Sequence, residues 1–353
     1  KIHQITDLGD TKLFTASVLP CIIIFSIGHT KDKEKVGFTS VYQEFSEVSN
    51  VPKISNLFDA IYQEGTYMVP DGRVYRYQQG SMQSVELDNT WAIASEGNKH
   101  WIEQVQSRTW MTLADIGKIR VGIKTTADNV FIGDDWSGEK SELELLQPLI
   151  THRNAGQIIA NRQDRWKVLY THTMVDGKKV AYNIDNYPKS KAYLLTHFEQ
   201  LNARNYVKKA NRKWYEIWVP QNPEAWKHRK IVFRDISEKP QFWLDDTGAI
   251  VNGDCYWIDI NQDIVDDVVY LALAVANSSF IEKFYDIKFN NKLYSGKRRY
   301  QTQYVEQFPI PYYGSNEAKE AITLVKKIIA EDTERVSLDD KAKLDSLVEQ
   351  MFS

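Results

Sequence analysis

Hydrophobic and polar positions at the start of the chain follow the pattern of β-strands. Residues 2–8 alternate as a strand does, Gly9 and Asp10 interrupt the pattern, and residues 17–27 form a β-branched, apolar run. Such a run is typical of a central strand that is buried on both faces. A hairpin with one fully apolar strand is not stable alone. We therefore expect the beginning of the chain to be the tail of a larger sheet.

The middle of the chain predicts short strands separated by loops and a few helices. A strand at 117–121 stops at Gly122, gives way to a basic, hydroxyl-rich loop, and resumes at 130–132. Gly122 permits a close backbone approach or a positive φ angle at this point. Further strands are predicted at 36–41, 166–171, 179–184, 230–233 and, as a pair, within 242–258, with turns at 70–72 and 176–177 and helices at 97–107, at 141–150 and from Tyr187 onward.

The last third of the chain predicts helices. Residues 263–285 have the pattern of the longest helix, and a strand follows that ends at Phe308-Pro309-Ile310-Pro311. From Asn316 the apolar positions recur as in two amphipathic helices. The pattern as a whole predicts an α+β fold with mixed sheets. Its segments are 1–35, a connecting region at 36–112, a main domain at 113–313 and a helical hairpin at 314–353.

Composition limits the class of protein. With 353 residues, 42% of them hydrophobic, the chain can bury a substantial core. Its two cysteines, Cys21 and Cys255, are far apart in sequence, which favours a reduced, cytoplasmic protein over a disulfide framework or a metal knuckle. The longest apolar run, Val18 to Ile27, is strand-sized and contains Pro20, and it has neither a basic leader nor a cleavage site. We expect no contact with a membrane and no signal peptide.

The charge is unevenly distributed. The net charge of −3 argues mildly against a nucleic-acid partner, but basic residues without acids fill the stretches 200–215 and 287–305, and a third basic group lies at 227–234. A local positive field can attract DNA although the net charge does not. Each run taken alone is equally compatible with an ordinary solvated face.

Six short motifs occur in a fixed order over roughly 300 residues. They are Asp7-Leu8-Gly9-Asp10 with Phe14 and the apolar run after it, the loop that follows Gly122, Leu149-Ile150-Thr151-His152-Arg153-Asn154, Lys230-Ile231-Val232-Phe233-Arg234, Ala276-Asn277-Ser278, and Phe308-Pro309-Ile310-Pro311. Their order resembles the C-terminal part of TaqI-type adenine-N6 DNA methyltransferases and related type II restriction–modification proteins. One departure is His152, which stands where that family often has glycine.

The resemblance implies a role for each segment. Residues 1–35 would be the last two strands of the methyltransferase sheet with a linker, and Phe14 would stack on an adenine flipped out of the duplex. Residues 113–313 would be the target-recognition domain. The expected partners are then double-stranded DNA and the catalytic methyltransferase domain of the same parent chain.

Residue types within the predicted loops suggest the DNA contacts. Arginine pairs with guanine and glutamine with adenine in the major groove, and lysine suits phosphate. Tyr300, flanked by basic residues, is expected to act on DNA, whereas Trp214, Tyr215 and Trp218 are expected in the core. The complete set of predicted DNA-binding residues is Lys124, Thr125, Thr126, His152, Arg153, Asn154, Lys208, Arg234, Lys292, Lys297, Arg298, Arg299, Tyr300, Gln301 and Gln303.

Catalytic motifs are missing from the sequence. Adenine methyltransferases use a Pro-Pro loop at the reacting base and a glycine-rich loop for S-adenosylmethionine, and this chain has neither. Pro70-Asp71 and Glu317-Ala318-Lys319 are too far apart to suggest a nuclease site, and the histidines lack zinc-site spacing. We expect no catalysis, no metal and no cofactor here, and S-adenosylmethionine in the full-length parent. Two alternatives stay open: a freestanding subunit like those of type I systems, and a protein-interaction module.

Overall fold

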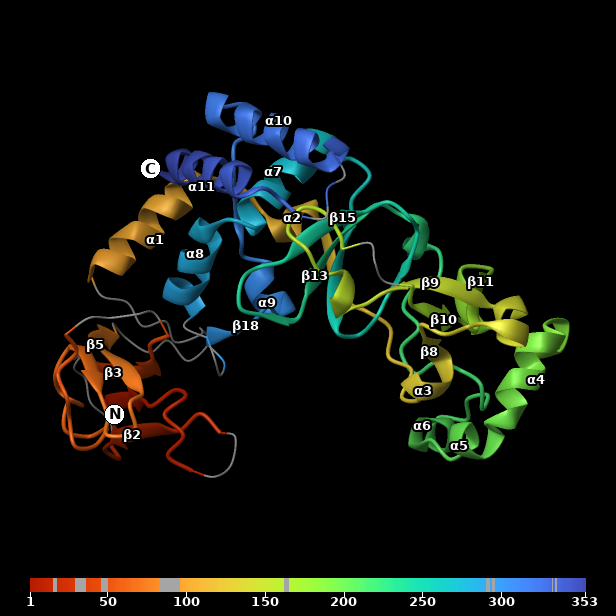
Figure 1. The fold of residues 1–353 in the computed structure, drawn as a ribbon, viewed down its shortest axis with the longest axis horizontal. Helices are drawn as coiled ribbons and strands as arrows, with labels where there is room; N and C mark the ends of the chain where they lie inside the picture. Colours follow the sequence, from red (N-terminus) through yellow and green to blue (C-terminus); the bar gives the residue numbers. More distant parts are fainter. Residues whose placement is uncertain are drawn as a thin grey trace.

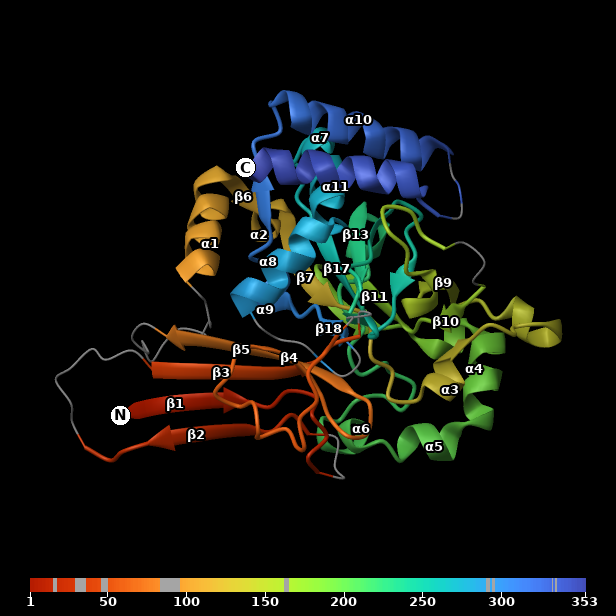
Figure 2. The ribbon, with the colours of Figure 1, turned by 60° about the vertical axis from the view of Figure 1, so that its left-hand side comes forward.

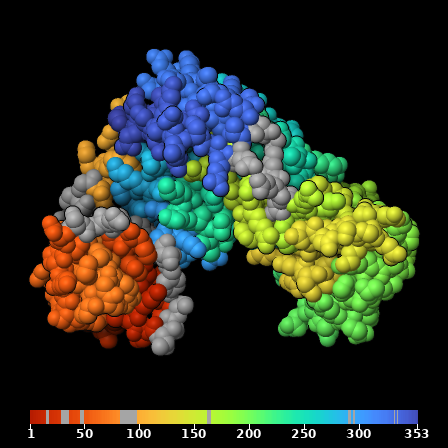
Figure 3. All heavy atoms as spheres, in the orientation of Figure 1, coloured from red at the N-terminus to blue at the C-terminus, as the bar shows by residue number. Residues whose placement is uncertain are grey.

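The computed structural model describes residues 1–14, 18–28, 36–45, 50–82, 96–161, 165–289, 293, 296–331, 333 and 335–353. The fold is α+β, as the sequence predicts. Two lobes extend from a central body that is capped by the C-terminal helices (Figure 1). One lobe is formed by the N-terminal sheet and the other by the segment from α3 (Asp128–Phe131) to η4 (Ala225–Lys227). Figure 3 shows that this face of the molecule is hollowed between the two lobes.

The N-terminal lobe is one five-stranded sheet in the order β2-β1-β3-β5-β4. Its strands are β1 (Ile2–Asp7), β2 (Cys21–Phe25), β3 (Val36–Gln43), β4 (Gly65–Met68) and β5 (Val74–Met82). β1 runs parallel to β3 and antiparallel to β2. Val41, Tyr75 and Tyr77 are fully buried in its core. The predicted boundary at residue 35 therefore divides a continuous sheet.

The position of β2 corrects the prediction of a doubly buried central strand. β2 lies at the free edge of the sheet (Figure 2), and all five of its residues are exposed. Ile23 and Ile24, which point to opposite faces, are 47% and 50% exposed. The apolar sequence of β2 is typical of a buried strand. In the described part of the chain, however, only β1 pairs with β2.

The central body is built on the antiparallel sheet β15-β13-β17-β7. Its strands are β7 (Gly117–Val121), β13 (Lys230–Arg234), β15 (Phe242–Asp245) and β17 (Cys255–Ile260). Alternate residues enter two different cores: Phe233 packs toward the helices and Val232 toward the second lobe. The helices of the first core are α1 (Glu96–Arg108), α7 (Asp266–Ala276), α8 (Ser279–Phe289), α10 (Asn316–Glu331) and α11 (Leu338–Phe352).

The second lobe combines a small sheet with short helices. The sheet has the order β16-β9-β10-β8, and a hairpin β11-β12 lies apart from it. The strands are β8 (Ile132–Gly133), β9 (Leu146–Ile150), β10 (Lys167–Leu169), β11 (His172–Val175), β12 (Lys178–Ala181) and β16 (Ile250–Val251), and the helices are α3 (Asp128–Phe131), α4 (Pro188–Thr196), α5 (Phe198–Asn202) and α6 (Asn205–Lys209).

Short elements complete the described part of the chain. They are β6 (Thr109–Thr112), which pairs with β19 (Pro309–Pro311), β14 (Ile236–Ser237), which pairs with β18 (Arg298–Arg299), the helices α2 (Leu113–Ile116) and α9 (Thr302–Val305), and the 3-10 turns η1 (Gly138–Glu142), η2 (His152–Asn154), η3 (Ile184–Asn186) and η4 (Ala225–Lys227).

Several predicted elements are confirmed and four are corrected. The predicted helix at 97–107, the strand at 230–233 and the two C-terminal helices are present. Residues 141–150 contain the end of η1 and strand β9 instead of a helix, and residues 130–131 belong to the single turn α3. The predicted pair within 242–258 is not a hairpin, because β15 and β17 lie on opposite sides of β13. The predicted helix at 263–285 is two helices separated at Asn277 and Ser278.

Among the helices that the structure describes, none has both the length and the apolar character needed to cross a bilayer.

Candidate functional site

Three backbone segments from distant parts of the sequence meet at one end of β7. The amide of Ile123 donates to the carbonyl of Val251 at 2.7 Å, and the amide of Asn252 donates to the carbonyl of Ile150 at 2.8 Å. Glycine makes this approach possible. A Cβ atom on Gly122 would lie 2.1 Å from the carbonyl oxygen of Asn252. Of the two roles predicted for Gly122, a close backbone approach or a positive φ angle, the structure shows the close approach.

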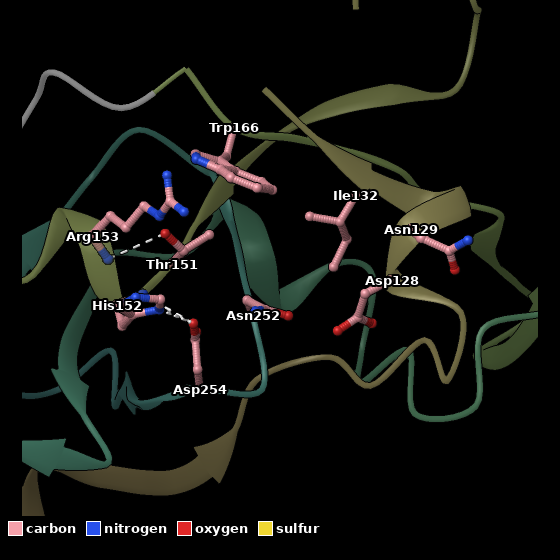
Figure 4. Close-up of a pocket in the computed structure, with 9 residues that line it drawn as sticks. All are labelled: Asp128, Asn129, Ile132, Thr151, His152, Arg153, Trp166, Asn252 and Asp254. Atoms are coloured by element: carbon pink, nitrogen blue, oxygen red, sulfur yellow. Dashed lines mark hydrogen bonds and ion pairs between the residues drawn. The ribbon is translucent and has the colours of Figure 1, made fainter. Parts of the chain in front are cut away.

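A pocket of about 300 Å³ lies beside this junction. Figure 4 shows that its side chains come from α3 and β8, from the turn after β9, from Trp166 before β10, and from the turn between β16 and β17. α3 lies on the side of the second lobe that faces the hollow (Figure 1). The lining residues are Asp128, Asn129, Ile132, Thr151, His152, Arg153, Trp166, Asn252 and Asp254.

His152 is held in place by Asp254. The Oδ2 atom of Asp254 lies 2.5 Å from Nδ1 of His152 and also accepts from the backbone amide of His152 at 3.3 Å. A carboxylate can only accept hydrogen bonds, so Nδ1 carries a proton in this arrangement. The other ring nitrogen, Nε2, remains for a ligand: it accepts when the ring is neutral and donates when the ring is charged. Asp254 thus fixes both the orientation and the tautomer of His152.

Arg153 and Asn154, which follow His152, have different environments. The guanidinium of Arg153 is exposed and lies 4.8 Å from the centre of the Trp166 ring, a cation–π arrangement. Asn154 is buried: its side-chain oxygen accepts from the amide of Thr151 at 2.9 Å, and its amide nitrogen donates to the carbonyl of Asn161 at 3.1 Å. Asn154 closes the turn, which corrects its predicted role as a DNA contact.

The loop after Gly122 presents two of its three predicted DNA contacts. Lys124 and Thr126 are exposed, and Thr126 has a positive φ of 59°. Thr125 is only 1% exposed, and its hydroxyl donates to the carboxylate of Asp128. Buried Arg204 supports the loop by donating to the carbonyl of Thr125 at 3.0 Å. Thr125 is therefore a structural residue rather than a DNA contact.

The segment 298–303, predicted to read bases, is largely committed to the fold. The side chain of Arg298 is 11% exposed and forms ion pairs with Asp286 and Glu282 from α8. Tyr300 is fully buried, with its ring 5.2 Å from that of Tyr285. These positions correct the prediction that Arg298 and Tyr300 contact DNA. Sequence order does not reveal the acids of another element that neutralise a basic run.

The rest of segment 298–303 remains accessible. Arg299 is exposed, with Asp235 at 3.3 Å, and Gln303 is exposed as well, whereas Gln301 is half-buried at the start of α9.

The remaining predicted contacts lie elsewhere on the surface. Lys208, on α6, and Lys297 are exposed, and Arg234 is half-buried at the end of β13. Phe14 is 60% exposed in the connection between β1 and β2. Lys292 lies outside the described residues.

Sequence reasoning missed or misplaced several of these residues. Trp218, expected in the core, is 39% exposed, and its ring is tilted against that of Tyr206 with the ring centres 4.6 Å apart, whereas Tyr215 is buried as predicted. Asp128, Trp166 and Asp254 line the pocket but were not predicted to belong to any site. The sequence feature that could have indicated Asp254 as a site residue is the turn Asn252-Gly253-Asp254 between two strands. Within the described ranges, no three His, Cys, Asp or Glu side chains are grouped so that they can hold a metal ion.

Comparisons with known proteins relate part of this fold to a known domain family. Residues 173–310 match the family model of the TaqI-like C-terminal specificity domain. This chain carries a TaqI-like specificity domain. The match includes β13, β17, Asp254 and segment 298–303, whereas the turn with His152 precedes it.

Relatives extend the similarity of the specificity domain over nearly the whole chain. The type II methyltransferase M.BanIII of Aneurinibacillus aneurinilyticus is 36% identical over 341 residues, which cover 93% of this chain and 59% of that protein. The type II methyltransferase M.BstVI of Geobacillus stearothermophilus is 25% identical, over 100% of this chain and 59% of that protein. The chain thus spans about three fifths of the length of these relatives.

A solved structure supports the same fold. The type IIL restriction–modification enzyme MmeI, in complex with DNA, aligns with 100% of this chain and 43% of its own, with a TM-score of 0.54 and 12% sequence identity. At this identity the likeness concerns the fold of the specificity domain and the regions around it.

Proposed function

We propose that this chain recognises a short sequence in duplex DNA as part of an adenine-N6 DNA methyltransferase of a type II restriction–modification system. The specificity-domain match and the type II methyltransferase relatives support the proposal. The observation that carries it is the convergence of the loop after Gly122 with the His152 turn beside one pocket. Both segments were predicted as DNA-facing from the sequence. Gly122 lets its loop approach the turn at Asn252, and the amide of Asn252 bonds to Ile150, directly before the His152 turn.

The duplex would lie in the hollow between the two lobes (Figure 3). α6, with Lys208, lies at the inner edge of the second lobe, and β18 lies near the roof of the hollow (Figure 1). Exposed Lys124, Lys208 and Lys297 would contact phosphates, because lysine ammonium groups neutralise backbone charge without reading sequence. His152 and Arg153 would contact base edges.

The catalytic step would belong to the rest of the parent protein. That part would bind S-adenosylmethionine, the methyl donor, and extrude the target adenine from the duplex. Exposed Phe14 would stack on this base. The uncovered strand β2 would receive further strands of the catalytic sheet, since its outer edge and both faces are available among the described residues.

Selection from a pool of random duplexes, followed by sequencing at several salt concentrations, tests this proposal. We expect enrichment of one short site and binding that weakens steeply with salt, because bound phosphates release counterions. Lys208→Ala should weaken binding to all sequences alike and lower the salt slope by about 1. Arg153→Ala should instead relax the preference at one position.

Lys319→Ala is the matched control, because Lys319 is exposed and belongs to α10, a helix on the far side of the body from the hollow (Figure 1). Binding equal to that of the unmodified chain is expected. No enrichment and no salt-sensitive binding would contradict the proposal and favour a protein-interaction module.

A further inference from the structure

The pocket around His152 has the polarity of a hydrogen-bond acceptor site. Asp128 and Asp254 contribute carboxylates, which accept hydrogen bonds and cannot donate them when ionised. A phosphate would meet two carboxylates against the one guanidinium of Arg153, so the pocket suits the DNA backbone poorly. An exocyclic amino group has the complementary chemistry, and the major groove displays it on adenine N6 and cytosine N4.

The shape of the pocket suits the edge of a flat ring. Trp166 and Ile132 form one wall, and His152, Asn252 and Asp128 face them across the central opening (Figure 4). Apolar walls beside a few fixed polar groups are typical of sites that read a ligand by its edge. The turn that bears His152 is fixed by Thr151 and by buried Asn154, so the polar side rests on a rigid support.

We propose that this pocket reads one base pair of the bound duplex by accepting a hydrogen bond from adenine N6 or cytosine N4, and that Asp254 determines this preference. The proposal rests on the proposed function. Nε2 of His152 is the acceptor, because Asp254 keeps the proton of the neutral ring on Nδ1. Asp254 is a positioning residue, since it acts through His152.

The test uses the 353-residue chain and the duplex site found by selection. Each adenine is replaced in turn by purine, and each cytosine by 2-pyrimidinone, which lack the exocyclic amino group. We expect one position at which this loss weakens binding by roughly 5- to 100-fold, the range of a good base contact. Asp254→Ala and His152→Ala should bind that analogue and the natural site equally, with an unchanged salt slope.

A second histidine–aspartate pair provides the matched control. Nδ1 of His228 lies 3.1 Å from Oδ1 of Asp259, and the pair is similarly exposed but lies outside the pocket. Asp259→Ala should keep the full sensitivity to the analogue. His152→Ala also guards against a folding defect in Asp254→Ala, because the His152 side chain is 45% exposed and its removal opens no core.

The outcomes separate the two proposals. If the unmodified chain selects a site, but no analogue weakens binding, or the Asp254 and His152 variants remain as sensitive as the unmodified chain, the assignment of this pocket is wrong and DNA recognition stands. If the unmodified chain selects no site, the proposed function fails, and the assignment of the pocket fails with it.

Discussion

The carboxylate of Asp286 binds the guanidinium of Arg298 through two parallel hydrogen bonds, of 2.7 Å to Nε and 2.8 Å to Nη2. Asp286 lies on α8 and Arg298 on β18, so this pair connects the helices of the central body to the roof of the hollow. Bidentate pairs of this kind are strong and have a fixed geometry.

Replacement of Arg298 should therefore affect folding more than DNA contact. We expect Arg298→Ala to lower the free energy of unfolding by about 3 kcal/mol, because it leaves Asp286 and Glu282 without their shared cation. Arg299→Ala, at an exposed neighbour, should cost less than about 1 kcal/mol. Urea unfolding of both variants measures the difference. An Arg298→Ala protein that is fully stable but no longer binds DNA would show that Arg298 contacts DNA and does not stabilise the fold.

Tyr300 offers a sharper separation of structure from recognition. Its ring is fully buried, burial raises the pKa of its phenol, and its hydroxyl has no hydrogen-bond partner in the described part of the chain. Tyr300→Phe should leave the stability unchanged or raise it by up to about 1 kcal/mol, because it removes an unsatisfied polar group. Thermal unfolding and DNA selection on the same variant are the measurements. A changed base preference would show that the residue acts on DNA after all.

Glu144 should make the second lobe sensitive to acid. Its carboxylate accepts from the amides of Lys189 and Ser190 at the beginning of α4, at 3.0 and 2.8 Å. Burial raises the pKa of Glu144, but the hydrogen bonds from Ser190 and Lys189 outweigh it and lower the pKa from 4.5 to about 2. Because the folded-state pKa is depressed, the stabilisation is complete above pH 4.5 and disappears as the pH falls toward 2.

The test compares Glu144→Gln with the unmodified chain across that pH range. At pH 7 the variant should be less stable by about 1 kcal/mol, the value of a helix cap. The difference should shrink toward zero as the pH falls to 2, because Glu144 is then protonated in the unfolded state and becomes protonated in the folded state as well. Glu142→Gln removes only an exposed pair with Lys189 and should change little. A difference between Glu144→Gln and the unmodified chain that does not depend on pH would exclude the cap as its cause.

Gly122 should tolerate no side chain. A Cβ atom there would lie 2.1 Å from the carbonyl oxygen of Asn252, and the backbone of that turn must move. Gly122→Ala should lower stability by about 1–3 kcal/mol, as overpacking does, and weaken the selection for the DNA site. Gly133→Ala is the control, because the nearest contact of its Cβ is a side-chain atom of Trp136 at 3.3 Å. Equal behaviour of the two variants in unfolding and selection would contradict the tight junction.

Elements whose pattern depends on local sequence were predicted well. The amphipathic helices α10 and α11 and the close approach at Gly122 follow from periodicity and from the properties of glycine. Elements decided by distant partners were not. Leu149 and Ile150 belong to a strand because β9 pairs with β10 and β16, although the alternation of acids and leucines favoured a helix.

Asn277 shows the same limit within a helix. Its side-chain amide bonds to the amide and carbonyl of Phe242, at 2.9 and 2.8 Å, and this tertiary contact accompanies the break between α7 and α8. In the candidate site, too, local features were predicted and a contact between distant residues was not. His152 and Arg153 were predicted from their loop and line the pocket, whereas Asp254, which fixes His152, lies 102 positions away in sequence.

The free edge of β2 has a practical consequence for work with this chain in solution. Among the described residues only β1 pairs with β2, so the outer edge beside Ile22, Ile23 and Ile24 is open. Two copies can join edge to edge there and bury apolar area without any change in fold. Self-association would then rise with protein concentration and would persist at high salt, where attraction to DNA fades. A charged residue at the outer edge, such as Ile23→Lys, should keep the chain monomeric.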